Sequence, residues 1–95
     1  MSYVRVVRFT DVSAERIDAL AERISQNDGP PEGVTSSGIQ VLFDAEQGTA
    51  VVVQLFETEQ NMLDSEAVLA AMPAGDTPGT RASVDRCELK IEMTA

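Results

Sequence analysis

Apolar residues recur with two different periods along the chain, and these periods predict six structural elements. Where β-branched and aromatic residues cluster, or where apolar residues stand at every second position, we expect strands. Where apolar residues stand three and four positions apart behind a capping residue, we expect helices. The predicted elements, in chain order, are a strand over 3–9, a helix from Ala14 to the turn at 27–31, strands over 38–44 and 49–57, a helix after Thr58, and a strand over 83–93.

Each predicted helix begins behind a residue that can cap it. Ser13 and Thr58 have side-chain oxygens that can accept a hydrogen bond from the first helical turn. Glu15 and Glu59 follow in those first turns, where a negative charge is favourable. The first helix carries one apolar stripe, formed by Ile17, Leu20, Ala21 and Ile24.

The order β-α-β-β-α-β is that of the ferredoxin-like split βαβ fold, which belongs to the α+β class. In this fold two helices cover one face of a four-stranded antiparallel sheet with strand order 4-1-3-2, so the first and last strands are neighbours. The strand over 49–57 is apolar on both sides, which is typical of a central strand. A chain of 95 residues is expected to form one domain, over 1–95.

The helices can cover only one face of this sheet, yet apolar residues occupy both faces of its inner strands. The strands over 3–9 and 49–57 have bulky apolar residues on both sides, and the pattern leaves open which side of the first strand meets the helices. On the last strand we expect Cys87, Leu89 and Ile91 to face the helices. An exposed apolar sheet face marks an interaction surface, and a twofold homodimer that packs one sheet on another would cover it.

The charge of the chain is strongly negative and unevenly distributed. Sixteen acidic residues against seven basic ones give a net charge of −9. All of this excess lies between residues 26 and 80, whereas the bases gather within 1–25 and 81–95, which the fold places together. The acidity excludes the basic footprint of a nucleic-acid-binding protein and a polybasic membrane anchor.

The remaining composition is typical of a cytoplasmic protein without membrane partners. No apolar run approaches the ~20 residues that cross a bilayer. The first residues lack the basic and apolar regions of a secretory signal. The single cysteine, Cys87, fits a reducing compartment and excludes an internal disulfide.

The chain has no His and no Trp, and this excludes several kinds of site. Without His it has no Ser-His-Asp or Cys-His catalytic pair and no histidine metal site, and one cysteine excludes a zinc cysteine cluster. The acidic residues Glu57, Glu59, Asp64 and Glu66 lack convergent ligand spacing, so we interpret them as a solvated helix face. We therefore expect no metal and no cofactor, and the sequence identifies no catalytic residue.

The βαββαβ order, the length of 95, the two-sided strands and the Phe56-Glu57-Thr58-Glu59 passage into a helix resemble the dimeric α+β barrel proteins, above all the antibiotic-biosynthesis-monooxygenase-like branch. The resemblance implies a homodimer whose two sheets form a barrel, and in some members each protomer has a small pocket between sheet and helices. The family's enzymes include cofactor-independent oxygenases of polycyclic aromatic quinols and haem-degrading oxygenases. Their active sites use Asn-Trp-Arg-Tyr or Asn-Trp-His sets, which have no counterpart in a chain without Trp and His.

Two functions follow as expectations. The first is a small homodimeric barrel protein that binds a small organic molecule or has no catalysis of its own. The alternative is a cofactor-independent monooxygenase-like enzyme that acts on an aromatic or polyketide-type substrate. The composition favours the first, because the family's catalytic side chains are missing.

The candidate ligand-binding residues are Arg5, Gln54, Arg86 and Tyr3. Arg5 and Arg86, together with Lys90, could bind a carboxylate or a phenolate, since a guanidinium matches planar oxyanions. The alternative for these bases is ion pairing across the strands with Glu88 and Glu92, or pairing across the dimer.

The other candidates each have a structural alternative. Tyr3 is the only tyrosine, so one interpretation is that it is the phenolic donor to a ligand. The alternative is that it packs on the partner at the sheet edge. For Gln54, on a central strand, one interpretation is that it orients a ligand inside the barrel. The alternative is a buried amide whose hydrogen bonds are satisfied by a neighbour. Cys87 stands among apolar residues and is expected to be buried and inert.

Overall fold

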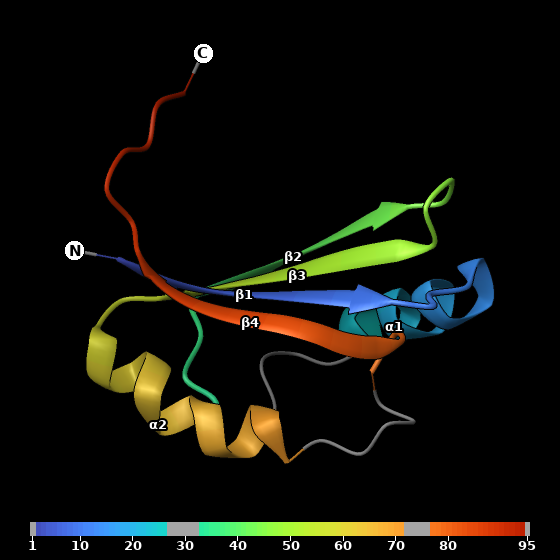
Figure 1. Cartoon of the computed structure of the whole chain (residues 1–95). Coiled ribbons are helices and arrows are strands. Elements are labelled where there is room, and N and C mark those ends of the chain that lie inside the picture. Colours follow the sequence, from blue (N-terminus) through green and yellow to red (C-terminus); the bar gives the residue numbers. More distant parts are fainter. Residues whose placement is uncertain (1, 27–32, 72–76, 95) are drawn as a thin grey trace.

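The structure, a computed structural model, describes residues 2–26, 33–71 and 77–94. Its elements are β1 (Tyr3–Thr10), α1 (Ala14–Gln26), β2 (Gly38–Asp44), β3 (Thr49–Phe56), α2 (Glu59–Ala70) and β4 (Thr80–Glu88). The strands form one antiparallel sheet in the order β2-β3-β1-β4, which is the predicted order counted from the opposite edge. The ferredoxin-like βαββαβ fold is thus confirmed, and both helices lie on the same side of the sheet (Figure 1).

The predicted helix caps are both present. The backbone N–H of Arg16 donates to Ser13 Oγ over 3.2 Å, and the N–H of Asn61 donates to Thr58 Oγ1 over 3.1 Å. Thr58 has the extended backbone of an N-cap residue, with φ −135° and ψ 156°. The turn at 27–31, which we expected to end α1, lies outside the described residues.

Two apolar clusters fill the space between the sheet and the helices. The first lies against α1 and consists of Val7, Phe9, Val12, Ile17 and Ala50. The second lies against α2 and consists of Val34, Phe56, Met62 and Leu69, with Tyr3 packed on it. Because both clusters use odd-numbered residues of β1, the side of this strand that carries Tyr3, Val7 and Phe9 faces the helices. The structure thereby settles the orientation that the sequence pattern left open.

The last strand differs from its prediction in extent and in orientation. It spans Thr80–Glu88 and not 83–93, because the register pairs Glu88 with Tyr3, the first residue of β1. Residues directly opposite in an antiparallel pair share a face. Since Cys87 pairs with Val4, it lies on the side away from the helices, and the expectation that Cys87, Leu89 and Ile91 face them is wrong.

The sheet face away from the helices, which we call the open face, is apolar as predicted. Its apolar side chains are the alternate residues Val4, Val6, Leu42, Val51, Val53 and Leu55, and the same register places the polar residues Arg8, Gln40, Asp44, Ser83 and Asp85 on this face. All of the apolar side chains except Leu42 are half-buried, and Leu42 is 54% exposed. The segment 89–94 continues from β4 and rises from the sheet on this side (Figure 1). In the described part of the chain, neither helix is long and apolar enough to cross a membrane.

Candidate functional site

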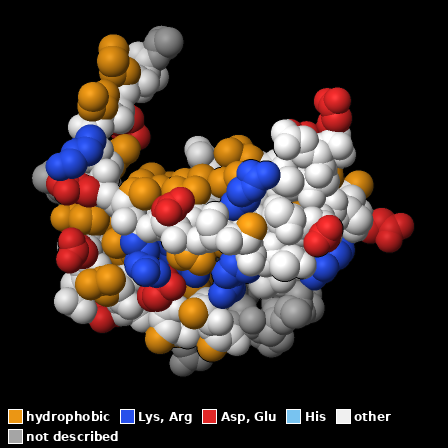
Figure 2. Space-filling view, in the orientation of Figure 1, with side chains coloured by type: hydrophobic (Ala, Val, Ile, Leu, Met, Phe, Trp, Pro, Cys, Tyr) orange, Lys and Arg blue, Asp and Glu red, His pale blue; other side chains and the backbone are white. Residues whose placement is uncertain are grey.

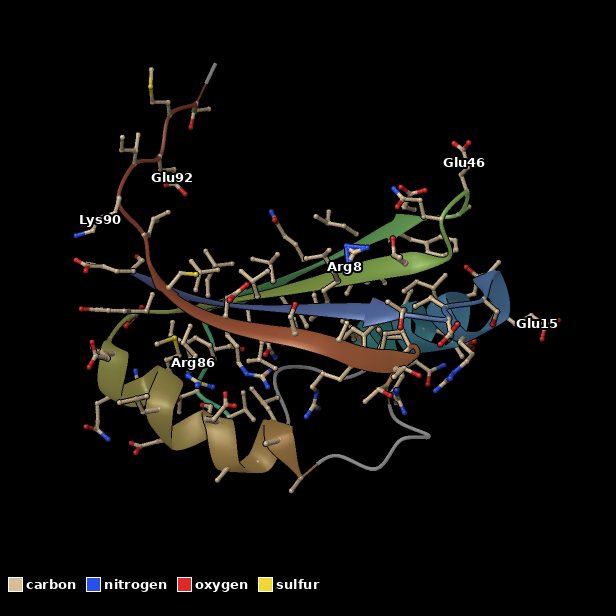
Figure 3. All side chains as sticks on the ribbon, viewed as in Figure 1. Arg8, Glu15, Glu46, Arg86, Lys90 and Glu92 are labelled. Carbon is tan, nitrogen blue, oxygen red and sulfur yellow. The ribbon has the colours of Figure 1, made fainter. Side chains whose placement is uncertain are left out.

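Three of the predicted site residues form one row across the three neighbouring strands β3, β1 and β4. The register places Arg5 of β1 between Gln54 of β3 and Arg86 of β4. Since paired residues share a face, all three lie on the side that carries the helices. Figure 3 shows Arg86 on this side, above α2, and Arg8 on the opposite side of the sheet. Tyr3 lies two residues before Arg5 and therefore on the same face, so the structure brings all four candidates together.

The row runs between the two apolar clusters, and its inner members are buried. Tyr3 and Phe56 lie on one side of it along the strands, and Val7 lies on the other. Arg5 is only 3% exposed and Gln54 only 6%. A guanidinium in such a position is costly unless its charge and its donors are satisfied.

Glu66 of α2 supplies part of that compensation. Its Oε2 accepts from Arg5 Nε over 2.6 Å, and its Oε1 accepts from Arg86 Nη1 over 3.1 Å. The carboxylate therefore bridges two arginines on neighbouring strands. The side chain of Glu66 is 25% exposed. Our interpretation of Glu66 as part of a solvated helix face is wrong. The sequence contains the signal that places Glu66 on the inner face of α2. Met62, Glu66 and Leu69 have the four- and three-residue spacing of one helix face.

One nitrogen of Arg5 is left without compensation. Arg5 Nη2 is buried and has no hydrogen-bond acceptor among the described residues. The Glu66 carboxylate engages Nε, and its second oxygen is directed to Arg86. A buried donor without an acceptor is rare in folded proteins and costs about 1–3 kcal/mol, more when it is charged. The arrangement thus offers one oriented, cationic donor to an acceptor that is not part of the described chain.

A further arginine, Arg81, approaches α2 from β4, and the sequence pattern did not single it out. Its Nη2 donates to the carbonyl oxygen of Leu69 over 3.2 Å, while its Nε is buried with no acceptor among the described residues. The predicted strand begins at residue 83 and leaves Arg81 outside it, whereas β4 begins at Thr80. Three arginines, at positions 5, 81 and 86, therefore contact α2, and Glu66 forms ion pairs with two of them, Arg5 and Arg86.

The remaining candidates have positions that differ from their expectations. Lys90 pairs with Glu88, Nζ to Oε2 over 3.2 Å, but it lies beyond β4 and apart from the row. Tyr3 packs against the α2 cluster from an inner strand, so the interpretation as a sheet-edge aromatic is wrong. Cys87 is exposed and not buried, because it lies on the open face.

Figure 2 shows how charge is arranged around this site. Lys and Arg side chains lie beside the β4 edge, above α2, with some acidic side chains among them and others extending from the periphery of the molecule. Within the described residues, no group of three or more His, Cys, Asp or Glu side chains is placed to hold a metal ion. The row and the neighbouring Tyr3 therefore offer hydrogen-bond donors: two guanidinium groups and one amide in the row, and one phenol beside it.

Comparison with known proteins adds no family to this picture. No protein-family model matches the chain, and no curated protein or solved structure with which it was compared matches it. The function therefore has to be argued from the site itself.

Proposed function

We propose that this protein binds a small organic anion, a carboxylate or a phenolate, between its sheet and α2, and has no catalysis of its own. The observation that carries the proposal is Arg5 Nη2, a buried cationic donor without an acceptor. An anionic oxygen placed there would complete the hydrogen bonding of the guanidinium. Charge-assisted hydrogen bonds of this kind are roughly twice as strong as neutral ones.

The neighbours of Arg5 support an organic ligand over a bare inorganic ion. Gln54 presents an amide beside the guanidinium, which can orient a second polar group. Tyr3 offers an aromatic surface on the same face, and small-molecule sites usually combine apolar walls with a few placed polar groups. Arg86, which is partly exposed, lies on the edge strand β4 and can attract an anion from solvent.

We also propose that the chain is one of the dimeric α+β barrel proteins, in the antibiotic-biosynthesis-monooxygenase-like branch, and acts in the cytoplasm. The βαββαβ order and the apolar residues on both faces of the sheet support the first part. The single cysteine supports the second. The absence of Trp and His favours binding over the alternative, a cofactor-independent monooxygenase that acts on an aromatic or polyketide-type substrate.

The test is calorimetric titration with salicylate, which carries a planar carboxylate and a phenol, and with its neutral analogue salicylamide. The variants are Arg5→Met and a matched control, Arg8→Met, which makes the same change on the same strand but on the open face. We expect salicylate to bind the wild type and Arg8→Met, and to bind Arg5→Met at least about tenfold more weakly.

Three results would contradict the proposal. The first is equal affinity of the wild type for salicylate and salicylamide, which would remove the need for an anion. The second is unchanged salicylate affinity in Arg5→Met. Absence of binding by salicylate, benzoate and 1-naphthoate up to about 10 mM, well above the ~1 mM dissociation constant of a weak ligand, would also reject it.

A further inference from the structure

Arg81 has the same incomplete hydrogen bonding as Arg5, at another position on the face that carries the helices. Its Nη2 donates to the carbonyl oxygen of Leu69 over 3.2 Å, in the last turn of α2, where a cation is favourable. Its Nε is buried and has no acceptor among the described residues, as is the case for Nη2 of Arg5. The contact with the end of α2 therefore explains one nitrogen of Arg81 and leaves a second donor unused.

An irregularity in the pairing of β4 turns Arg81 towards the helices. The register of β4 on β1 is regular up to the pair of Arg8 with Ser83. Its continuation would place Ala82 opposite Phe9, and Arg81 would then lie on the open face. A register shift between Arg8 and Phe9 pairs Arg81 with Phe9 instead. Since Phe9 belongs to the buried core between the sheet and the helices, Arg81 faces the helices as well. β-Bulges that re-aim a side chain in this way are common next to functional sites.

An apolar pair of residues separates the two unused donors on this face. The register places Val7 opposite Val84, between Arg5 and Arg81 along the sheet. From Arg5 to Phe9, the partner of Arg81, β1 extends about 13 Å at the rise of a strand. Val84 lies on the edge strand and is only partly buried. The face therefore carries a cationic donor, an apolar stretch and a second cationic donor in succession.

The two guanidinium groups also meet α2 at separate positions. Arg5 donates to the side chain of Glu66, and Arg81 donates to the carbonyl oxygen of Leu69. Three residues of an α-helix extend about 4.5 Å along its axis. We therefore interpret the two unused donors as two places for anionic groups.

The charge on this face is consistent with two anionic groups. The three arginines that contact α2 carry three positive charges, and Glu66 supplies one negative charge. Among the strand residues that the register places on this face, the acidic one is Glu88, which pairs with Lys90 over 3.2 Å. Three positive charges and one negative charge leave two positive charges in this set, and buried charges need such compensation.

We propose that the ligand is an organic dianion with a carboxylate at each end of an apolar spacer. One carboxylate accepts from Arg5 Nη2, the other accepts from Arg81 Nε, and the spacer passes Val84. This inference rests on the proposed function, which requires only the anionic group at Arg5. It adds a second subsite and narrows the ligand class to dicarboxylates. A few placed polar groups around an apolar wall are the usual means by which a small-molecule site orients its ligand.

The test is calorimetric titration with the straight-chain diacids from malonate to suberate and with the monomethyl ester of each. An ester keeps the chain of its diacid and removes one charge. At a pH of about 7.5 both carboxyl groups of the diacids are ionised. We expect the wild type to bind at least one diacid longer than malonate at least about tenfold more tightly than the matching ester.

The variants are Arg81→Met and the matched control Arg8→Met, which makes the same change on the open face. We expect Arg8→Met to keep the preference for the diacid, and Arg81→Met to bind diacid and ester equally, because the second carboxylate has lost its donor. The readout is a ratio of two affinities within one variant, so a loss of stability at the end of α2 does not imitate it. Circular dichroism checks that each variant is folded, and the wild-type titrations decide the question without any variant.

Three outcomes would overturn this inference. They are equal wild-type affinity for every diacid and its ester, a preference that survives in Arg81→Met, and tightest binding of malonate, since a compact dianion needs only one place. Salicylate separates the inference from the proposed function. If salicylate binds through Arg5 while no diacid is preferred over its ester, the dicarboxylate inference fails alone. If neither salicylate nor any diacid binds, both fail.

Discussion

At Arg5 the contribution of a side chain to stability can be distinguished from its contribution to ligand binding. It lies between two apolar clusters, is nearly fully buried, and has one nitrogen without an acceptor. A buried ion pair is often no more stabilising than apolar side chains of similar volume. If Arg5 serves to bind a ligand, its guanidinium adds little to the free energy of unfolding.

We therefore expect Arg5→Met to keep its free energy of unfolding within about 1 kcal/mol of the wild type, or to exceed it. Methionine fills a similar volume, and Glu66 keeps its pair with Arg86. Arg5→Ala, which leaves a cavity, is expected to lose about 2–4 kcal/mol. Urea unfolding at one fixed protein concentration measures both. If Arg5→Met lowers the free energy of unfolding as much as Arg5→Ala does, the guanidinium is needed for the fold.

At the scale of elements, the hairpin between β2 and β3 shows how a short turn is held. The carboxylate of Asp44 accepts from the backbone N–H of Gln47 over 3.1 Å and from Gln47 Nε2 over 2.9 Å. These hydrogen bonds, the backbone one first, lower the pKa of Asp44 below its ordinary value of 3.8. Gly48 completes the turn at φ +67°, where a side chain would be strained, and its carbonyl accepts from the N–H of Val12 over 2.9 Å.

The lowered pKa gives a pH dependence with a defined sign. A carboxyl whose pKa is lower in the folded state stabilises the protein above pH 3.8, and this contribution is lost as the pH falls through the folded pKa. We expect Asp44→Ala to lower the thermal midpoint at pH 7, and the difference from wild type to shrink well below pH 3.8. Thermal melts followed by circular dichroism measure it, with Glu46→Ala as the control in the same turn. A difference that persists in acid would mean that the charge of Asp44 is not its cause.

Elements were predicted well where their signals are local. Both helix caps and the two ends of β2 follow from residue types that act within a few positions. The prediction for β4 failed because its alternation continues into residues 89–94, whereas strand pairing ends where β1 begins, at Tyr3. A strand needs a neighbour, and its own sequence does not show where that neighbour ends.

At the scale of the whole molecule, the chain has a net charge of −9, while three of its arginines contact α2. Such a charge destabilises a compact chain through self-repulsion, and salt screens it. We expect the thermal midpoint to rise when sodium chloride is increased from about 10 mM to about 150 mM, as the Debye length falls. The exposed-site variants Glu46→Lys and Glu57→Lys reduce the repulsion and should reduce this response. A midpoint that falls with salt would show that the ion pairs at Glu66 outweigh the repulsion.

The amino-acid pattern by itself determined the order of the elements, the sheet topology, the inner position of β3 and the apolar character of both faces. These features depend on periodicity and on short-range capping, which the sequence displays directly. Only the tertiary structure decided that Arg5 faces the helices and Cys87 the open side. Strand register controls this, and a shift of one residue exchanges the faces of a whole strand. It also decided that Glu66 bridges Arg5 and Arg86, since a contact across 61 positions of the chain depends on how α2 lies on the sheet.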